Sequence, residues 1–186
     1  MARRTGLATA ALMRHAQKHA NLERYLAQGQ KRANLRSARA AIDAKVRAIT
    51  ATYNLGHPRY RGINAKKRHF HVHQTGPEIV REVVRAPMGI SLKYYGLRTT
   101  QDGLSFSIRR GRVSFIRSGF TNQSLGLHGF TRVGQQRLPI RKRFGPGLAQ
   151  LADAPAVRQA GNERYGQRVT EEIRKEEDRA YRRAKL

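Results

Sequence analysis

The residues best suited to metal chemistry are three histidines that alternate along one stretch, His69, His71 and His73. On a β-strand alternate side chains project from the same face, so these three rings would lie together. Imidazole nitrogen is a common zinc ligand, and such a row offers two or three ligands to one ion. No carboxylate or thiol stands nearby to complete the site, and the basic residues 66–68 repel a cation. We interpret the row as the polar face of a half-buried strand and predict no bound metal.

A second arrangement with catalytic potential is a pair of acids, Glu78 and Glu82, four residues apart. On a helix they would share a face, but a two-metal nuclease needs several converging carboxylates. The two acids are better explained as partners of Arg81 and Arg85. The sequence contains no serine–histidine–acid motif and no phosphate-cradling glycine loop with its lysine. We predict that the protein is not an enzyme, and that it uses no cofactor.

Basic clusters give the broadest signal in the chain. Arginine is about three times as common as lysine, and its planar fork suits phosphate contacts. No aromatic platform accompanies the clusters at a spacing typical of single-strand binding, and no base-reading motif is present. We expect binding by charge and not by base sequence. The candidate contacts to DNA or an acidic partner are Arg109, Arg110, Arg112, Arg117, Arg137, Arg141, Lys142 and Arg143.

The charge of the whole chain supports a polyanionic or acidic partner. Its 186 residues include 38 basic and 12 acidic ones, a net charge of +26. Residues 1–150 carry +24 of this, whereas residues 151–186 hold seven acids and only +2. Nucleic acid is the usual partner of such a composition. The contact should therefore come from the first 150 residues.

Cysteine and long apolar runs are both missing from the sequence. Without cysteine the chain has no disulfide, thiolate zinc site or thiol nucleophile. No apolar run is long enough to cross a bilayer, so we expect no membrane partner. Residues 1–13 faintly resemble a signal peptide, but their apolar part is interrupted and soon followed by basic residues. We therefore do not expect export.

Apolar periodicity predicts helices at both ends of the chain. Residues 3–27 and 31–53 suggest two helices separated at Gly29, and a loop follows at 54–62. A closing helix begins near Val157. The second helix carries an apolar stripe that must pack on a sheet or on another subunit. The candidate packing residues on it are Leu35, Ile42, Val46 and Ile49.

Between the helices the period changes to two. Residues 66–73 and 129–133 read as strands, and residues 79–85 suit either a strand or a helix. The clearest hairpin spans residues 104–116 and turns at Arg110-Gly111, with Val113 and Phe115 on one face of the returning strand. These elements predict an α+β fold, with a small and mostly antiparallel sheet flanked by a long N-terminal helix and a C-terminal helix. We expect one folded unit with extensions: a helical region 1–55, a β-rich core 56–150 and the helix 151–186.

The stretch 126–148 carries three motifs in order. Phe130-Thr131-Arg132-Val133-Gly134 is a strand end, Arg137-Leu138-Pro139-Ile140 is a turn, and Gly145-Pro146 follows. Together with Lys31-Arg32-Ala33-Asn34, residues 88–98, the hairpin and Ser118-Gly119-Phe120, this order resembles the minor tail protein Z family, the tail completion proteins of long-tailed bacteriophages. The resemblance covers roughly residues 30–183, and the first 28 residues have no counterpart in it.

The resemblance implies a structural virion protein that completes the head-proximal end of a phage tail and helps to join the tail to the DNA-filled head. It would be made in the host bacterial cytoplasm and end in the neck of the virion. Its partners would be the tail terminator, head-completion or connector proteins and the end of the packaged DNA, in a ring-shaped homo-oligomer that is six-fold by preference. The candidate interface turn is Leu138, Pro139, Ile140, Gly145 and Pro146. A basic RNA-binding ribosomal protein is the alternative, because it accounts equally well for the charge and the helical extensions.

Overall fold

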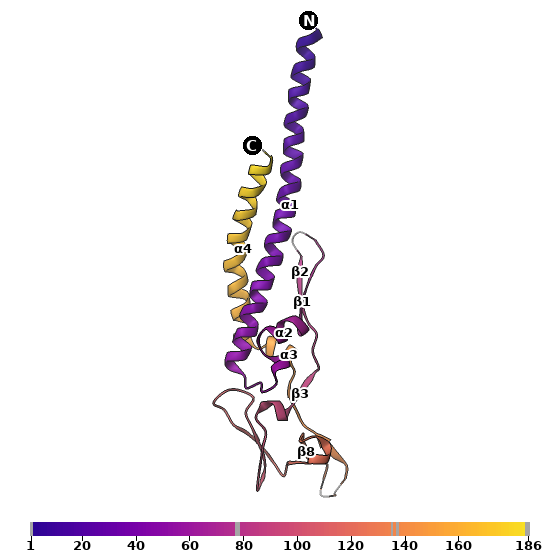
Figure 1. The fold of residues 1–186 in the computed structure, drawn as a ribbon, viewed down its shortest axis with the longest axis vertical. Coiled ribbons are helices and arrows are strands. Elements are labelled where there is room, and N and C mark those ends of the chain that lie inside the picture. Colours follow the sequence, from indigo (N-terminus) through magenta and orange to yellow (C-terminus); the bar gives the residue numbers. More distant parts are fainter. Residues whose placement is uncertain (1, 77–78, 135, 137, 185–186) are drawn as a thin grey trace. The chain divides into compact units, whose positions relative to one another are not determined.

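The computed structural model describes residues 2–76, 79–134, 136 and 138–184, with the side chains of the first helix from residue 12 onward. A long N-terminal helix, small antiparallel sheets and a C-terminal helix make up the fold, so the predicted α+β class is confirmed (Figure 1). The contacts divide the chain into two compact units. Unit 1 comprises Met1–Ala41, Val72–Glu82 and Glu163–Leu186, and unit 2 comprises Ile42–His71 and Val83–Asn162. Each unit therefore contains segments from all three of the consecutive ranges that were expected, 1–55, 56–150 and 151–186.

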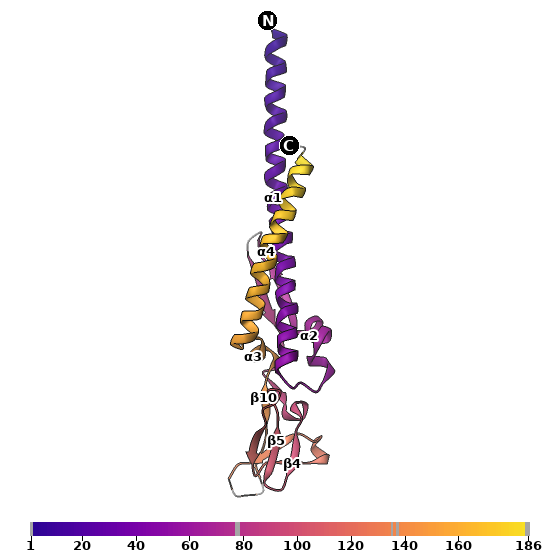
Figure 2. The same ribbon diagram turned by 90° about the vertical axis from the view of Figure 1, so that its left-hand side faces the viewer.

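The N-terminal region is one helix, α1 (Ala2–Thr52), so the predicted break at Gly29 is wrong. In unit 1, α4 (Pro155–Ala184) runs antiparallel beside α1 in both views (Figures 1 and 2). A Cβ atom on Gly29 would stand 2.9 Å from the Cβ of Glu176. Glycine in a helix interior costs about 0.5–1 kcal/mol relative to alanine. Here the missing side chain permits the close approach of α4.

Two carboxylates of α4 are buried more deeply than the apolar residues beside them. Tyr165, Val169 and Ile173 are only half-buried, whereas Glu172 and Glu176 are 5% and 2% exposed. Five basic residues pair with these two acids: Arg32, Arg36, Arg168, Lys175 and Arg179. Glu176 accepts hydrogen bonds from Arg32 at 2.7 Å, Arg36 at 2.8 Å and Arg179 at 2.6 Å, and Glu172 accepts from Arg36 at 3.1 Å and Lys175 at 3.3 Å.

The pKa values of both carboxyls reflect this arrangement. Burial by itself raises the pKa of Glu176, but the hydrogen bonds and charges of Arg32 and Arg179 outweigh it. The pKa therefore lies below its ordinary value. Glu172 behaves in the same way, because hydrogen bonds from Arg36 and Lys175 overcome the effect of burial and lower its pKa. Both acids stay ionised inside the helix pair at neutral pH.

The part of α1 that precedes this pairing is exposed. All side chains of residues 12–20 are open to solvent, including the apolar Leu12 and Met13. Figures 1 and 2 show α1 continuing beyond the C-terminal end of α4 within unit 1. This stretch therefore depends largely on helix propensity and backbone hydrogen bonds, with a contact between the rings of His15 and His19 at 4.5 Å.

The core of unit 2 begins at the C-terminal end of α1. Ile42, Val46 and Ile49 are buried there, while Leu35, the fourth predicted packing residue, is half-buried in unit 1. The stripe is thus covered within this chain. Other fully buried side chains of unit 2 come from separate elements: Leu55, Ile90, Leu92, Tyr95, Leu104, Leu148 and Val157.

The histidine row is split between a helix and a strand. A 3-10 turn, η1 (Pro58–Tyr60), leads into α2 (Gly62–His69), and only then does β1 (Phe70–Gln74) begin and pair with β2 (Val80–Val84). The predicted strand 66–73 is therefore wrong over its first half. Burial of Ala65 and His69, four residues apart, explains the helix. Glu82 lies on β2, so the segment 79–85 is strand, while Glu78 lies outside the described residues.

The remaining strands of unit 2 form three small antiparallel sheets. The first pairs β3 (Gly89–Ser91) with β10 (Phe144–Pro146). The second has the order β4 (Arg98–Thr100), β5 (Gly103–Phe106), β6 (Ser114–Arg117), and the third has β7 (Phe120–Thr121), β8 (Gly129–Arg132), β9 (Ile140–Lys142). Short 3-10 turns η2 (Leu92–Tyr95) and η3 (Gln123–Leu125) and the helix α3 (Leu148–Ala152) complete the unit.

The predicted hairpin turns at the expected residues but has a shorter ladder. Gly111 takes a positive φ of 75°, and the N–H of Arg112 bonds to the carbonyl of Arg109. Pairing of β5 with β6 nevertheless ends at Phe106 and Ser114, because the backbone of residues 108–110 bonds instead to residues 52–54 at the end of α1.

The returning strand of the hairpin exposes the two apolar residues that were predicted to share one of its faces. Val113 and Phe115 are exposed. Ile116 is the half-buried residue, and it stands opposite the buried Leu104. A shift of one residue in a strand exchanges its two faces, and the true register places Phe115 outside.

Candidate nucleic-acid interface

All predicted basic contacts that the structure describes are exposed and belong to unit 2. Arg137 lies outside the described residues. Between Glu82 and Asp153, residues 83–152 contain twelve basic residues and a single acid, Asp102. Such a surface attracts polyanions and repels cations. The described basic residues lie in three places. Arg109, Arg110 and Arg112 are in the loop between β5 and β6, Arg141, Lys142 and Arg143 are on β9 and just after it, and Arg117 is at the end of β6.

The loop between β5 and β6 is held against the end of α1. The N–H of Arg110 donates to the carbonyl of Thr52 at 3.0 Å, and its side-chain Nε donates to the carbonyl of Thr50 at 3.2 Å. The N–H of Asn54 donates to the carbonyl of Ile108 at 2.9 Å. These bonds fix the backbone on one side of the turn and leave the arginine side chains exposed to solvent.

The second basic cluster does not gather on one face. Arg141 and Lys142 are consecutive on β9 and point to opposite sides of the sheet. The Nζ atom of Lys142 lies 5.4 Å from the ring centre of Phe144, and Nε of Arg143 donates to the hydroxyl of Thr131 at 2.8 Å. The sequence cluster 141–143 is thus spread over the sheet.

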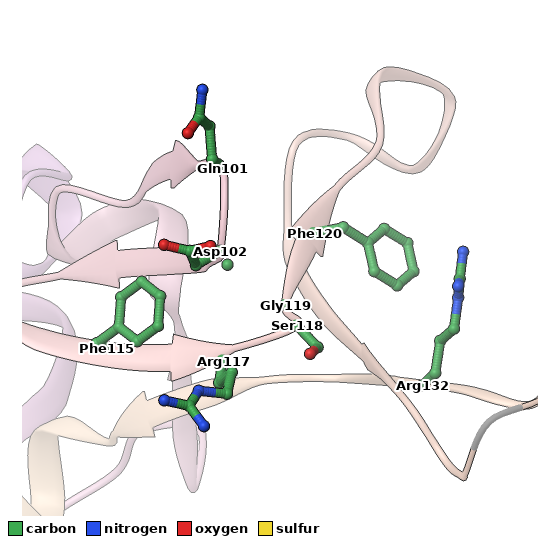
Figure 3. Close-up of a pocket in the computed structure, with 9 residues that line it drawn as sticks. Gln101, Asp102, Phe115, Arg117, Ser118, Gly119, Phe120 and Arg132 are labelled. Carbon is green, nitrogen blue, oxygen red and sulfur yellow. The ribbon is translucent and has the colours of Figure 1, made fainter.

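Arg117 forms one wall of an open cavity of about 830 Å³. Asp102, in the turn between β4 and β5, and Phe115, on β6, line the same cavity, and the neighbouring sheet supplies Phe120 and Arg132 (Figure 3). The remaining lining residues are Gln101, Gly103, Ser118 and Gly119. The cavity thus combines two guanidinium groups, two phenyl rings and one carboxylate.

A tight backbone connection shapes the floor of this pocket. Gly103 has a φ of 154°, and a Cβ atom there would collide with the carbonyl oxygen of Ile116. The N–H of Ser118, itself at a φ of 55°, donates to the carbonyl of Asp102 at 2.8 Å. A Cβ atom on Gly119 would stand 2.9 Å from the side chain of Leu104. The chain therefore passes from β6 to β7 close against β5.

Strand pairing brings Arg132 to the pocket. Phe120 on β7 stands opposite Phe130 on β8, and their rings lie 6.0 Å apart in a stacked arrangement. Arg132 follows Phe130 by two residues on the same face, so it is the diagonal neighbour of Phe120. Its guanidinium carbon lies 5.6 Å from the centre of the Phe120 ring. Figure 3 shows these two side chains facing each other.

The sequence reasoning selected Arg117 but missed the four other residues that define this pocket. It found no aromatic platform near the basic clusters, whereas the structure places Phe115 and Phe120 beside Arg117. The spacing Phe115-x-Arg117-x-x-Phe120 was the available signal. Arg132 is found only through the register of β7 and β8.

The predicted interface turn contains both loop and strand. Leu138 and Pro139 are exposed and joined by a cis peptide bond, and the carbonyl of Pro139 accepts from the N–H of Val133. Ile140 begins β9. Gly145 and Pro146 do not form a turn, because they lie in β10. Glycine is required at 145, since a Cβ atom would stand 2.6 Å from the ring of Tyr95.

Two histidines of unit 2 make specific side-chain contacts. The Nδ1 atom of buried His69 donates to the carbonyl of Arg85 at 2.8 Å, so this ring is a structural element. Oγ of Ser91 lies 2.7 Å from Nδ1 of His128. Burial, with the charges of Lys142 and Lys93, lowers the pKa of His128. Among the described residues no carboxylate bonds to this imidazole, and no three metal-ligating side chains converge.

Comparison with known proteins leaves the motif resemblance as a prediction. None of the helices in the described part of the chain is both long and apolar enough to span a membrane. The chain matches no protein-family model, no curated protein and no solved structure.

Proposed function

We propose that this protein is a structural component that completes the head-proximal end of a phage tail and helps to join the tail to the DNA-filled head. The ordered set of motifs in residues 30–183 is the observation that carries the proposal. Each motif is weak by itself, but their common order is specific. In this role the protein acts by shape and positive charge and performs no catalysis.

The distribution of charge supports this function. A part that borders a DNA channel needs a basic surface without acidic interruptions, and residues 83–152 carry twelve basic residues against one acid. The loop that bears Arg109, Arg110 and Arg112 is anchored to the end of α1 while its side chains remain exposed. We propose that this loop faces DNA or an acidic neighbour in a closed ring of copies.

Immunogold labelling of sedimented particles from the producing cells tests where the protein acts. We expect gold at the junction between phage heads and tails, with no label when the antibody is first absorbed with purified protein. Gold on ribosomes would instead support the RNA-binding alternative. Phage particles without gold would also contradict the proposal.

The role of the basic loop is tested by complementation of a phage that lacks this protein. Replacing Arg109 and Arg112 together with serine should lower the titre of infectious particles at least tenfold, because two exposed cations of the loop are lost while the Arg110 side chain still anchors it. The matched control replaces Arg182 and Arg183, two exposed arginines of the last turn of α4. Equal titres for the two variants would show that the loop has no special role.

A further inference from the structure

We infer that the cavity bordered by Phe115, Arg117, Phe120 and Arg132 binds an unpaired nucleotide of a single-stranded nucleic acid. The inference rests on the pocket alone and does not depend on tail completion. A base would stack on Phe115 while neighbouring phosphates meet the two arginines. Such a site reads an unstacked base, which the basic loop described above does not.

Phe115 provides the stacking surface. Its side chain is 49% exposed although it lies in a strand of the hairpin, and it forms part of the cavity wall (Figure 3). An exposed phenyl ring offers a face that any base can cover. Phe120 is already covered in part by Phe130 and Arg132, so the guanidinium plane of Arg132 is the second flat surface of the cavity. Guanidinium planes also stack on bases.

Charge supplies the second part of the argument. Arg117 and Arg132 lie in the same cavity and are both exposed. Arg132 rests on a ring and Arg117 extends from the end of β6, so neither is committed to an ion pair with a described acid. Exposed arginines that share a cavity with an aromatic ring match the neighbouring phosphates and base of a single strand.

The dimensions of the cavity favour a single strand over a duplex. Its volume of about 830 Å³ is in the range of small-ligand sites. In a duplex the base faces are covered by their neighbours, so they cannot stack on Phe115 unless a nucleotide leaves the helix. A free strand or a strand end presents such bases without that cost.

Asp102 gives the site a preference among bases. It is the single acid of residues 83–152, and it lies in the cavity beside Phe115 (Figure 3). A carboxylate repels phosphate but accepts hydrogen bonds from exocyclic amines, such as N4 of cytosine. Thymine and uracil lack that amine. We therefore expect oligo(dC) to bind more tightly than oligo(dT).

Fluorescence anisotropy with labelled 12-mers tests the site in the intact protein. We expect wild-type protein to bind oligo(dC) more tightly than a duplex 12-mer at 150 mM salt. Phe115→Ala should weaken binding to oligo(dC) by about 5- to 150-fold, the range for one lost stacking contact. The matched control is Phe144→Ala, which removes another exposed ring from unit 2 outside this cavity, and it should leave the affinity within about twofold.

Two further variants separate stacking from charge. Arg117→Ser should weaken binding to oligo(dC) and oligo(dT) equally and reduce the salt dependence by about one phosphate contact. Asp102→Ala should abolish the preference for oligo(dC). Unchanged affinity in Phe115→Ala, with circular dichroism like that of the wild type, would overturn the inference, and so would a duplex that binds as tightly as the single strand.

Ribo- and deoxyribo-oligomers identify the source of the strand. Tighter binding of oligo(dC) than oligo(rC) would support a DNA strand, and the reverse would support RNA. Either result supports the stacking site, whereas failure of both oligomers to bind contradicts it. Labelling of particles in the neck is a separate observation, so the two proposals can fail independently.

Discussion

Replacement of Glu176 by glutamine removes a buried charge that three arginines share. Its carboxylate is 2% exposed and accepts from Arg32, Arg36 and Arg179 at 2.6–2.8 Å. Loss of one partner from a fully buried ion pair costs about 3–5 kcal/mol. Here the arginine side chains are 41%, 45% and 53% exposed, so they regain water after the change. We therefore expect a smaller loss of about 2–3 kcal/mol in the free energy of unfolding.

For a chain of this length, each kcal/mol lowers Tm by about 2–4 °C. Glu176→Gln should therefore lower Tm by about 4–12 °C, measured by circular dichroism at 222 nm, which reports α1 and α4. The matched control is Glu177→Gln. It makes the same change of charge at the next position of α4, where the side chain is exposed, and should change stability by less than about 0.5 kcal/mol.

The comparison between these two variants isolates burial from net charge. Each raises the formal charge of the chain by one, so self-repulsion affects both equally. A Tm of Glu176→Gln within about 1 °C of the Glu177→Gln value would refute the reasoning, because it would show that the buried carboxylate adds nothing to the pairing of the helices.

Three further predictions concern stability. The pKa values of Glu172 and Glu176 lie below the ordinary value of about 4.3. The two ionised carboxylates therefore stabilise the fold above that pH, and this stabilisation is lost as the pH falls. Between pH 7 and pH 3, Tm should decline more steeply for the wild type than for a variant with both acids changed to glutamine. Ile42→Asp places an unpaired charge in a buried position and should cost more than about 4 kcal/mol, visible as loss of cooperative thermal unfolding. Tyr95→Phe removes the donor to the carbonyl of Pro146 at 2.6 Å and should cost about 1–3 kcal/mol in urea denaturation, while an equal midpoint would contradict the role of this bond.

The α+β class could be predicted from the sequence because long apolar periods and one clear turn determine it. Gly111 at the hairpin turn and the stripe at Ile42, Val46 and Ile49 were local signals. A helix break was predicted at Gly29 because glycine disfavours helices in general. The reason for glycine here is the close approach of Glu176, which lies 147 positions away in the sequence. Propensity cannot include such a contact.

The candidate site shows the same division. The high content of arginine was enough to predict that these side chains are exposed. The pocket could not be predicted, because it forms only where particular strands pair. Phe115 was placed on one face of its strand with Val113, but strand patterning alone does not show which face is buried. Arg132 reaches Phe120 only through the pairing of β7 with β8. The burial of two acids of α4 was not predicted, because it becomes visible only once Arg32 and Arg36 lie beside them.

Because residues 83–152 contain almost no acids, we expect the stability of unit 2 to depend on the salt and the polyanions in solution. Repulsion among the positive charges opposes the folded state most strongly in dilute buffer. A polyanion that binds only the folded chain stabilises it by about 2.7 kcal/mol at a concentration one hundred times its Kd. Thermal unfolding should therefore respond to heparin or nucleic acid as it would to a specific ligand. We therefore expect the isolated protein to be less stable than the same protein bound to a polyanion.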